Sequence, residues 1–521
     1  MTYPMSTGLA TESPTLSTRR AWLATAVLSA SLLVIVMDMT ILNVALPAMS
    51  ADLKPSADQV LWIVDVYSLV LAGLLVPAAA LADRWGRKRL LMAGYATFGL
   101  ASLLVLFADS AVAVIGIRTL LGIGGAFIMP TTLSTIRVLF TDARERARAL
   151  AVWASIAGLG AAIGPLIGGF LVEQFSWQSA FLVNVPLMAL AVVGAAFLIP
   201  ESRSADPGVW DWLGIVLSFS GITLLMWSVK HFGAQSSLLV PGGWAAMIGG
   251  SVLLTLFIRR SLRQERPMLD FGLFRNRVFT GGIAGALGSM FAMAAALLLL
   301  AQWLQAVEGS SPIRAGVELI PLAIAAAIAS LAAPALAERI GPRTVMAGGI
   351  AMAGLGMIVI YLVPGELHYA SVVVSLCLVG IGMGSLAIGS ALIMSGSPEN
   401  RAGNAAAMEE TSYELGSVVG VALLGSIAAV LYRQQLDGSD VLAGLDPTAG
   451  EAARESIGSA AATAQELHLP DLAHDAGVAF TESMQVTNLI GGLLMLGVAA
   501  TVFALVPKGT RLDATNSDVS R

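Results

Sequence analysis

The chain has 521 residues, of which 56% are hydrophobic and only 12% are charged, and its mean hydropathy is +0.80. An average soluble protein carries about 25% charged residues, so this composition excludes a soluble enzyme and a disordered chain. The net charge of −5 excludes a nucleic-acid binder, because it offers no basic surface to a polyanion. The composition indicates instead a membrane protein that crosses the bilayer many times.

Apolar runs divide the chain into fourteen predicted transmembrane helices. Each crossing takes roughly 20 apolar residues, and backbone groups in lipid must be hydrogen-bonded internally, which favours helices. The first run is too long for the core of a cleaved signal peptide, so we expect it to be retained as a helix. The predicted spans are 22–47, 59–81, 90–107, 111–132, 150–172, 178–199, 210–230, 240–258, 279–304, 313–336, 343–363, 368–395, 404–431 and 485–506.

The distribution of Lys and Arg predicts that both chain ends lie in the cytoplasm. If the N-terminus is cytoplasmic, 23 of the 29 basic residues fall in cytoplasmic segments and 5 in outer segments, with Arg118 inside a span. Cytoplasmic loops carry an excess of Lys and Arg, and one missed span would invert the pattern beyond it. The bias therefore supports both the number of spans and their direction.

Matching segments indicate that the chain contains an internal repeat. Residues 81–87 (LADRWGR) follow the second span and residues 336–343 (LAERIGPR) follow the tenth, with an acid, an Arg and a Gly repeated at an offset of 255. Residues 122–124 (GIG) of the fourth span match residues 380–382 (GIG) of the twelfth at an offset of 258. Such duplication is typical of transporters built from two related bundles.

The repeat predicts two six-helix bundles separated by an inserted helical pair. Six arginines in 259–278 favour an anchor on anionic lipid. His468 and His474 lie near acids in a polar outer loop, but their spacing matches no metal-ligand motif, so a solvated loop with one or two short helices is favoured. The predicted organisation is a cytoplasmic tail (1–21), an N-terminal bundle (22–199), inserted helices 7 and 8 with a basic cytoplasmic loop (200–278), a C-terminal bundle (279–506) including the outer loop (432–484), and a cytoplasmic tail (507–521).

Seven acidic or basic residues fall well inside the predicted spans, away from the span ends, and a charge at the bilayer centre costs roughly 2.5–3.5 kcal/mol. One arginine cannot pair with six acids, so pairing explains one or two of them and the others are expected to bind protons or cations. Glu410 and Glu414 share a helix face, whereas Glu409 points about 100° away. A function is favoured for Asp38, and Glu414 fits a structural and a functional role equally well. The seven are Asp38, Asp65, Arg118, Glu318, Glu409, Glu410 and Glu414.

Glycines recur at short spacing in the fifth span, in the sequence GAAIGPLIGG of residues 160–169. Glycines four apart let two helices pack backbone to backbone, and a proline kinks the helix that contains it. The segment therefore predicts a joint at which helices bend or slide. Its marked residues are Gly160, Gly164, Pro165, Gly168 and Gly169.

This segment resembles the helix 5 antiporter motif of the major facilitator superfamily, and further segments extend the resemblance over nearly the whole chain. Residues 83–88 (DRWGRK) are similar to the signature loop between helices 2 and 3, and Arg118 with Gly122 is similar to the helix 4 motif. Residues 38–47 (DMTILNVALP) resemble the helix 1 motif of the fourteen-helix drug:proton antiporters. Two segments resemble exporters of quaternary ammonium compounds, dyes and methyl viologen, namely 62–69 (WIVDVYSL) and 409–416 (EETSYELG).

The resemblance implies alternating access between two bundles around a central cavity. It implies that Arg118 tunes the protonation of Asp38, and that acids on helices 1, 2, 10 and 13 bind a cationic drug or a proton but never both. It also implies a cytoplasmic gate formed by Asp83, Arg84, Gly86, Arg87 and Lys88.

The expected function is proton-coupled multidrug efflux of lipophilic cations, including quaternary ammonium compounds, dyes and methyl viologen-like dications. The proton motive force would supply the energy, with no cofactor and no metal. The expected partners are these small cations, protons and the lipid bilayer, with no nucleic acid, and we expect a monomer in the cytoplasmic (inner) membrane of a bacterium. Trp62, Tyr67 and Tyr413 are candidates for an aromatic wall around the substrate, although each also fits a lipid-facing or core position.

Other functions compete with this interpretation. An exporter of one specific metabolite or antibiotic in the same superfamily would use the same helices and gate. A channel is disfavoured by the duplicated bundles and the gate segment. A membrane-embedded enzyme or sensor is disfavoured because the sequence shows no nucleophile–base pair, phosphate loop or metal-ligand cluster, and its four histidines are scattered. We therefore expect a carrier without enzymatic activity.

Overall fold

The computed structural model describes residues 17–55, 57–140, 142–204, 210–234, 241–265, 267–363, 367–398 and 401–510. These residues form helices and no β-strand, which confirms the predicted all-α architecture. Within them, thirteen helical segments are long and apolar enough to cross a membrane, and they coincide with thirteen of the fourteen predicted spans. The remaining predicted span, 150–172, falls within α5 (Ala143–Gln174), a helix of 32 residues.

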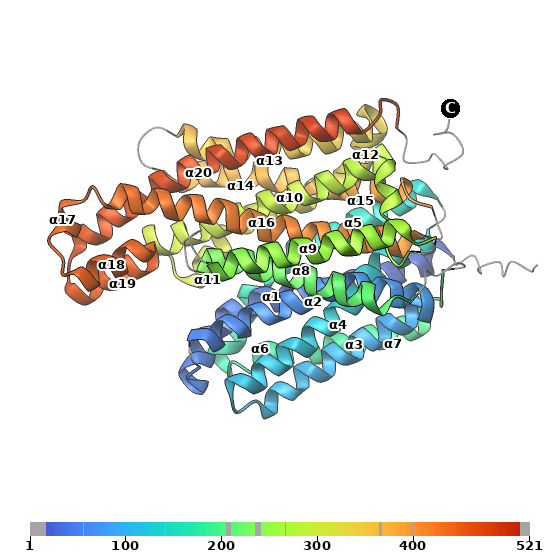
Figure 1. Cartoon of the computed structure of the whole chain (residues 1–521), viewed down its shortest axis with the longest axis horizontal. Coiled ribbons are helices and arrows are strands. Elements are labelled where there is room, and N and C mark those ends of the chain that lie inside the picture. The colour runs from blue at the N-terminus through green and yellow to red at the C-terminus, as the bar shows by residue number, and fades with distance from the viewer. Residues whose placement is uncertain are drawn as a thin grey trace, which may run out of the picture.

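The helices form two bundles that lie side by side, with a helical pair packed against both (Figure 1). The first bundle consists of α1 (Thr18–Leu53), α2 (Ala57–Trp85), α3 (Arg87–Leu104), α4 (Ala111–Leu139), α5, α6 (Ser179–Leu182) and α7 (Asn184–Leu198). The second consists of α10 (Arg277–Gln302), α11 (Pro312–Glu318), α12 (Ile320–Ile340), α13 (Pro342–Leu362), α14 (Tyr369–Gly384), α15 (Leu386–Ser395), α16 (Ala402–Leu436) and α20 (Pro470–Leu505). The inserted pair is α8 (Trp212–Ala234) and α9 (Pro241–Arg263), and α8 contacts both α2 and α16.

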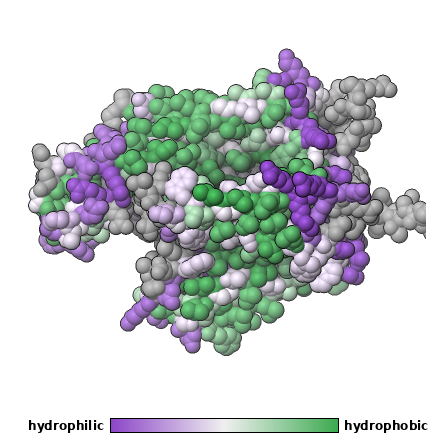
Figure 2. All heavy atoms as spheres, viewed as in Figure 1, coloured by the Kyte–Doolittle hydropathy of each residue, from purple (hydrophilic) through white to green (hydrophobic). Residues whose placement is uncertain are grey.

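Apolar residues cover the middle of the molecule on the face shown in Figure 2, and hydrophilic residues gather toward its two ends. Large hydrophobic side chains such as Phe197, Trp212 and Leu331 are exposed around both bundles and the inserted pair. A soluble protein rarely exposes so much contiguous apolar surface. Lipid is therefore the solvent for this surface.

Equivalent turns in the two bundles reflect the repeat predicted from the sequence. Gly86 links α2 to α3 and Gly341 links α12 to α13, with φ values of 116° and 86°. Residues other than glycine rarely adopt this conformation, so both turns depend on glycine. At Gly86 an added Cβ would also collide with the side chain of Glu201.

The repeat also determines how the second and fourth helices of each bundle pack. A Cβ on Gly122 of α4 would lie 2.8 Å from the backbone carbonyl oxygen of Tyr67 on α2. Gly380 of α14 lies against the backbone carbonyl of Leu322 on α12 in the same way. Tyr67 and Leu322 are 255 residues apart, which is the offset between the matching segments 81–87 and 336–343. Both bundles therefore follow one packing plan.

Three predicted spans are interrupted in the structure. The spans 178–199, 313–336 and 368–395 are each divided into two helices, at Val183, Leu319 and Ser385. The first two breaks precede Pro186 and Pro321, which cannot donate the backbone hydrogen bond that would continue the helix. At the third break the hydroxyl of Ser385 donates to the carbonyl of Gly382 at 2.6 Å and competes with the helical hydrogen bonds.

The segment predicted as an outer loop, 432–484, is largely helical. The flanking helices α16 and α20 extend into it, and Asp446 and Ser456 cap two of the short helices by accepting backbone N–H groups. The short helices are α17 (Asp440–Ala443), α18 (Pro447–Glu455) and α19 (Ile457–Leu467). They project from one end of the molecule (Figure 1, left). We call this the outer end and the opposite end the cytoplasmic end, following the predicted orientation.

The two bundles share a hydrophobic core toward the cytoplasmic end. Apolar residues of the first bundle form one cluster with residues from the first halves of α10 and α16 and from α15, including Phe279, Ile393 and Met408. A second cluster contains only residues beyond 277 among those described, and includes Leu300 and Met484 from the outer part of the second bundle. The bundles are therefore joined by apolar contacts mainly in their cytoplasmic halves.

Polar contacts between the bundles gather at the same end. Arg137, near the end of α4, donates to the hydroxyl and the carbonyl of Ser397 at 2.5 and 2.6 Å. Arg144 of α5 forms an ion pair with Glu338 of α12 at 3.4 Å. These contacts join the two bundles at the end that carries the gate segment.

Asp83 makes a further contact between the bundles. Its carboxylate lies against Gly403, in the first turn of α16, where an added Cβ would overlap it. The first turn of a helix presents N–H groups and a partial positive charge, which favour a carboxylate. Arg87 holds the same carboxylate at 2.9 Å. The structure is thus closed at its cytoplasmic end.

The inserted pair is fastened at the cytoplasmic end by Asp211, which precedes α8. Its carboxylate accepts hydrogen bonds from Nε and Nη2 of Arg260 at 2.7 and 3.1 Å and from Gln264 at 2.9 Å. The backbone N–H of Gly214 donates to it at 3.0 Å. Burial raises the pKa of Asp211, but these hydrogen bonds outweigh burial and lower the pKa to about 2.

We predict that Asp211→Asn lowers the Tm by roughly 2 °C, because Arg260 is partly exposed and solvent screens the ion pair. A depressed pKa stabilises the fold above the ordinary carboxyl pKa of about 4, and this stabilisation is lost only as the pH falls toward 2. The deficit should therefore be equal at about pH 5 and about pH 8. Thermal unfolding in detergent measures it, and a deficit that changes across this range contradicts the assignment.

We further predict that Gly403→Ala opens the cytoplasmic end, because the new methyl group displaces the carboxylate of Asp83. A reporter cysteine replaces Ala407, which is buried between the bundles, in a background with Cys377→Ser. Labelling by a water-soluble maleimide added from the cytoplasmic side should be several-fold faster in the variant. The matched control is Gly348→Ala, where an added Cβ meets open space. Equal labelling rates in the two variants would show that Gly403 has no role in closure.

Candidate functional site

Asp38 and Arg118 form an ion pair buried inside the first bundle. Nη1 of Arg118 is 2.8 Å from Oδ2 of Asp38, and the two side chains are 2% and 0% exposed. Nε of Arg118 also donates to the backbone carbonyl of Ile63 at 3.2 Å, so α1, α2 and α4 meet at this pair. Either charge alone would be strongly destabilised at this depth, and the pairing compensates both charges. The sequence placed both residues within spans, and the structure brings them together.

Tyr67 covers this pair from the side of α2. The guanidinium of Arg118 lies over its ring, 4.4 Å from the ring centroid. The side chain is buried, and its hydroxyl has no hydrogen-bond partner in the described part of the chain. Its helix α2 contacts both α4, which carries Arg118, and α16, which carries the acids of the second bundle.

Asn184 is a further partner of Asp38. Its Nδ2 donates to Oδ1 of Asp38 at 2.9 Å and to the hydroxyl of Ser102 at 3.3 Å, and the residue is fully buried. Sequence reasoning missed Asn184. An amide inside the apolar run 178–199, two residues before Pro186, is the signal that could have identified it.

Two acids of α16 are buried almost completely. Glu409 and Glu410 are 0% and 1% exposed. Glu409 accepts a hydrogen bond from the hydroxyl of Tyr413 at 2.5 Å. Both carboxylate oxygens of Glu410 are buried without a hydrogen-bond partner among the described residues. Glu414, one turn further along, is partly buried.

The helical period of α16 separates these acids into two directions. Glu410 and Glu414 lie on the face that also carries Gly403, which contacts Asp83 of the first bundle. Glu409 lies about 100° away, on the side of the glycines that pack against α10. Glu410 therefore faces the first bundle, whereas Glu409 points into its own bundle.

Asp65 and Glu318 are the other two predicted acids. Asp65 is partly buried on α2, and its backbone carbonyl accepts a hydrogen bond from Ser68. Glu318 ends α11 near the outer end, where it accepts from Arg314 at 2.8 Å and from Ser310 at 2.9 Å. Glu318 thus has a local cationic partner four residues earlier in the chain.

The gate segment 83–88 is held by the chain that follows α7. The backbone N–H of Arg87 donates to the carbonyl of Ser202 at 2.9 Å, and that of Lys88 donates to Glu201 at 3.2 Å. Lys88 Nζ donates to the backbone carbonyl of Ala196 at 2.6 Å, and Arg84 is exposed. These contacts fix the turn at Gly86 and so position Asp83 opposite α16.

The glycines of the predicted antiporter motif bring α5 close to α1. Added Cβ atoms on Gly160 and Gly168 would lie 3.1 and 3.2 Å from atoms of Val36 and Ile41, and one on Gly164 would overlap the hydroxyl of Thr40. Gly169 is buried, and the side chain of Pro165 lies outside the described part of the structure. The glycine face therefore packs on the segment of α1 that carries Asp38.

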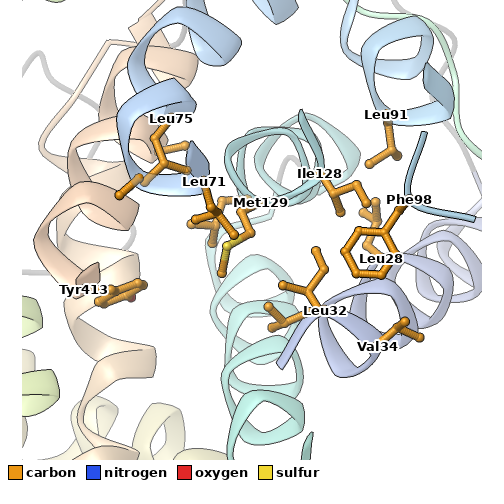
Figure 3. Close-up of a cluster of buried hydrophobic side chains, with 14 of the residues drawn as sticks. Leu28, Leu32, Val34, Leu71, Leu75, Leu91, Phe98, Ile128, Met129 and Tyr413 are labelled. Carbon is orange, nitrogen blue, oxygen red and sulfur yellow. The ribbon is translucent and has the colours of Figure 1, made fainter. Parts of the chain in front are cut away.

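Aliphatic side chains dominate the apolar contact between the bundles. In Figure 3, Tyr413 of α16 lies across from Leu71 and Leu75 of α2 and Met129 of α4. Trp62, the other predicted wall residue, is 46% exposed. Tyr67 and Tyr413 contact Arg118 and Glu409, as described above, so these tyrosines contribute to the charged centre as well as to the apolar contact.

Within the described ranges, no group of three or more His, Cys, Asp or Glu side chains is arranged to hold a metal ion. Nδ1 of His468 lies 3.0 Å from the backbone carbonyl of Gln465 at the end of α19. His231 stacks on Trp227 with ring centroids 4.5 Å apart.

Comparisons with known proteins agree with this geometry. The family model described as Major Facilitator Superfamily matches residues 28–421. The chain is 42% identical to the multidrug efflux pump LfrA of Mycolicibacterium smegmatis, over 94% of this chain and 97% of that protein. It is 36% identical to the methyl viologen resistance protein SmvA of Salmonella typhimurium, over 86% and 90%.

The fold also matches solved structures. The crystal structure of the human organic anion transporter MFSD10 (TETRAN) aligns with a TM-score of 0.59 at 13% identity, covering 91% of this chain and 99% of that one. At this identity the likeness concerns the fold alone. Together, the family model and the efflux-pump relatives show that the chain belongs to the major facilitator superfamily and, within it, to the drug:proton antiporter family.

Proposed function

We propose that this chain exports lipophilic cations from a bacterial cell in exchange for protons, as a monomer in the cytoplasmic membrane. Its family membership makes it a transporter with many apolar helices, and its relatives are named as multidrug efflux and methyl viologen resistance proteins. The proposed substrates are quaternary ammonium compounds, cationic dyes and methyl viologen-like dications.

The buried carboxylate of Glu410 carries this proposal. Both of its oxygens lack a hydrogen-bond partner in the described part of the chain, although the side chain is 1% exposed. An isolated carboxylate at such a site is strongly destabilised unless it takes up a proton or binds a cation. Glu410 also faces the first bundle. A lipophilic cation held between the bundles would therefore supply the charge that Glu410 lacks.

The ion pair of Asp38 and Arg118 supports a different role for Asp38. Its two oxygens accept hydrogen bonds from Arg118 and Asn184, so its charge is compensated. A cation gains little from a carboxylate that is already paired. We propose that Asp38 takes up the coupling proton when Arg118 moves away, and that Glu410 and Glu414 attract the drug.

Closure at the cytoplasmic end supports the proposed alternating access. The contact of Asp83 with Gly403 and the pairing of Arg144 with Glu338 hold that end together. Protonation of the acids from outside would weaken drug binding, and binding of a cation from inside would displace the protons. Because each ligand excludes the other, uptake of one is coupled to release of the other.

The charge balance explains why several acids would be useful. Moving one charge across 100 mV is worth about 2.3 kcal/mol, so exporting a dication against an inside-negative potential costs roughly 4.6 kcal/mol. One inward proton returns about 2.3 kcal/mol from the potential, and the pH gradient adds to it. Two or more coupled carboxylates would therefore make dication export favourable.

We predict that Asp38→Asn abolishes ethidium efflux from loaded cells and that Glu410→Gln slows it at least about tenfold. The reason is that the first variant removes the carboxylate proposed to take up the proton, and the second removes a carboxylate proposed to bind the cation. In the parent, efflux should stop when an uncoupler collapses the proton gradient. Glu451→Gln, on the exposed side of α18, is the matched control and should leave the rate unchanged. Uncoupler-sensitive efflux at the parental rate in Asp38→Asn would refute the coupling role.

We also predict that neutral variants of Asp65, Glu318 and Glu409 lose export of dications more than export of monocations, because a dication needs more counter-charge and more protons. The measurement compares the resistance that each variant confers against a bis-quaternary antiseptic and against ethidium. Equal loss of both substrates in every one of these variants would contradict the prediction. Absence of efflux of either cation from well-expressed parent protein would favour the exporter of one specific metabolite or antibiotic.

A further inference from the structure

We propose that Asn184 is a positioning residue that forms a hydrogen bond with Asp38 in both of its protonation states and thereby sets the pH at which the transporter couples. This inference rests on the proposed role of Asp38 as the proton-binding acid. Neither the sequence motifs nor the comparisons identify Asn184.

The position of Asn184 is fixed by the break between α6 and α7. The helix is interrupted at Val183, and Asn184 begins α7 as a fully buried side chain. Its Nδ2 donates to Asp38 at 2.9 Å and to Ser102 at 3.3 Å. The amide therefore connects α1, α3 and α7. The side chain of Asp38 is 0% exposed, so it has no contact with solvent that could replace this hydrogen bond.

The inference depends on the amide oxygen of Asn184. Oδ1 of Asn184 is buried and has no hydrogen-bond partner in the described part of the chain. An ionised Asp38 can only accept hydrogen bonds, so it uses the Nδ2 donor. A protonated Asp38 can also donate one and needs an acceptor. Rotating the amide by half a turn would place Oδ1 where Nδ2 now lies and would provide that acceptor.

Among the described residues, the side chains that hydrogen-bond to the Asp38 carboxylate are those of Arg118 and Asn184, and of these two only the amide can both donate and accept. The charged and titratable groups that face it are the guanidinium of Arg118 on α4, which only donates, and Tyr67 on α2, whose ring covers Arg118. On the α5 side, the close neighbours of α1 around Asp38 are the uncharged Gly160 and Gly164. The neutral amide of Asn184 adjusts to the proton without introducing a charge of its own.

The effect of losing the amide has a defined sign. A hydrogen bond to an ionised carboxylate is stronger than one from a neutral carboxyl, so the amide favours the ionised form overall. Asn184→Leu keeps the approximate size but removes both hydrogen-bonding groups, so Asp38 should hold its proton to higher pH. We expect the midpoint of the pH dependence of efflux to rise by about one unit.

The test measures the pH dependence of ethidium transport by purified protein in liposomes. Asn184→Leu should shift the midpoint upward while retaining transport at favourable pH. The matched control is Asn488→Leu, because Asn488 is also a buried asparagine but, among the described residues, it donates to Met484 of its own helix rather than to a charged group. This control should leave the midpoint unchanged. Asn184→Thr, which keeps one donor and one acceptor, should restore a midpoint near that of the parent.

Each result decides the inference. An unchanged midpoint in Asn184→Leu, or the same shift in Asn488→Leu, overturns it. If Asn184→Leu does not fold, as judged by its elution in detergent, the midpoint of Asn184→Thr is compared with that of Asn184→Ser and Asn184→Ala, and a midpoint independent of the side chain overturns it. Failure of the proposed function has a different signature, because Asp38→Asn would then keep the parental pH dependence with Asn184 intact.

Discussion

The buried ion pair between Asp38 and Arg118 sets the electrostatic balance on which the rest of the site depends. A charge in lipid-surrounded protein must be paired, protonated or bound to an ion. At 2.8 Å, Arg118 satisfies this requirement for Asp38 and leaves Glu410 across the interface without a donor among the described residues. The charge of Asp38 is thus compensated within the protein, whereas the charge of Glu410 is compensated when a proton or a cation binds. This asymmetry separates a proton site from a cation site.

The packing around this centre connects it to the ends of the molecule. Glycines of α5 allow close contact with α1, which carries Asp38, while α5 also contacts α12 and α15 of the second bundle. The helix that carries Glu410 begins at the turn where Gly403 meets Asp83. A movement of α16 would therefore change the position of Glu410 and the closure of the cytoplasmic end together. The inserted helix α8 contacts α2 and α16, so it touches both bundles at the same interface.

Sequence reasoning predicted the features that a lipid environment imposes, and it missed the contacts between helices that are far apart in the chain. Apolar length predicted the spans, and the charged residues within them marked Asp38, Arg118 and Glu410 as candidates, whose roles stay predictions. The pairing of Asp38 with Asn184 was not predictable in this way, because it joins helices 146 residues apart in the chain. Hydropathy marks where lipid ends rather than where a helix ends, so the segment 432–484 was predicted as an outer loop with one or two short helices, whereas it contains three short helices and the extended ends of α16 and α20. The pairing of Glu318 with Arg314 follows the four-residue helical spacing and could have been read from the sequence.

The central claim is that binding of a lipophilic cation between the bundles and protonation of the buried carboxylates exclude each other. The most direct test adds tetraphenylphosphonium to purified protein in weakly buffered detergent solution and measures the protons released. The account predicts proton release in proportion to the cation bound, with less release per bound cation after Glu410→Gln. Saturable binding of the cation without release of protons, across the pH range in which transport occurs, would contradict it.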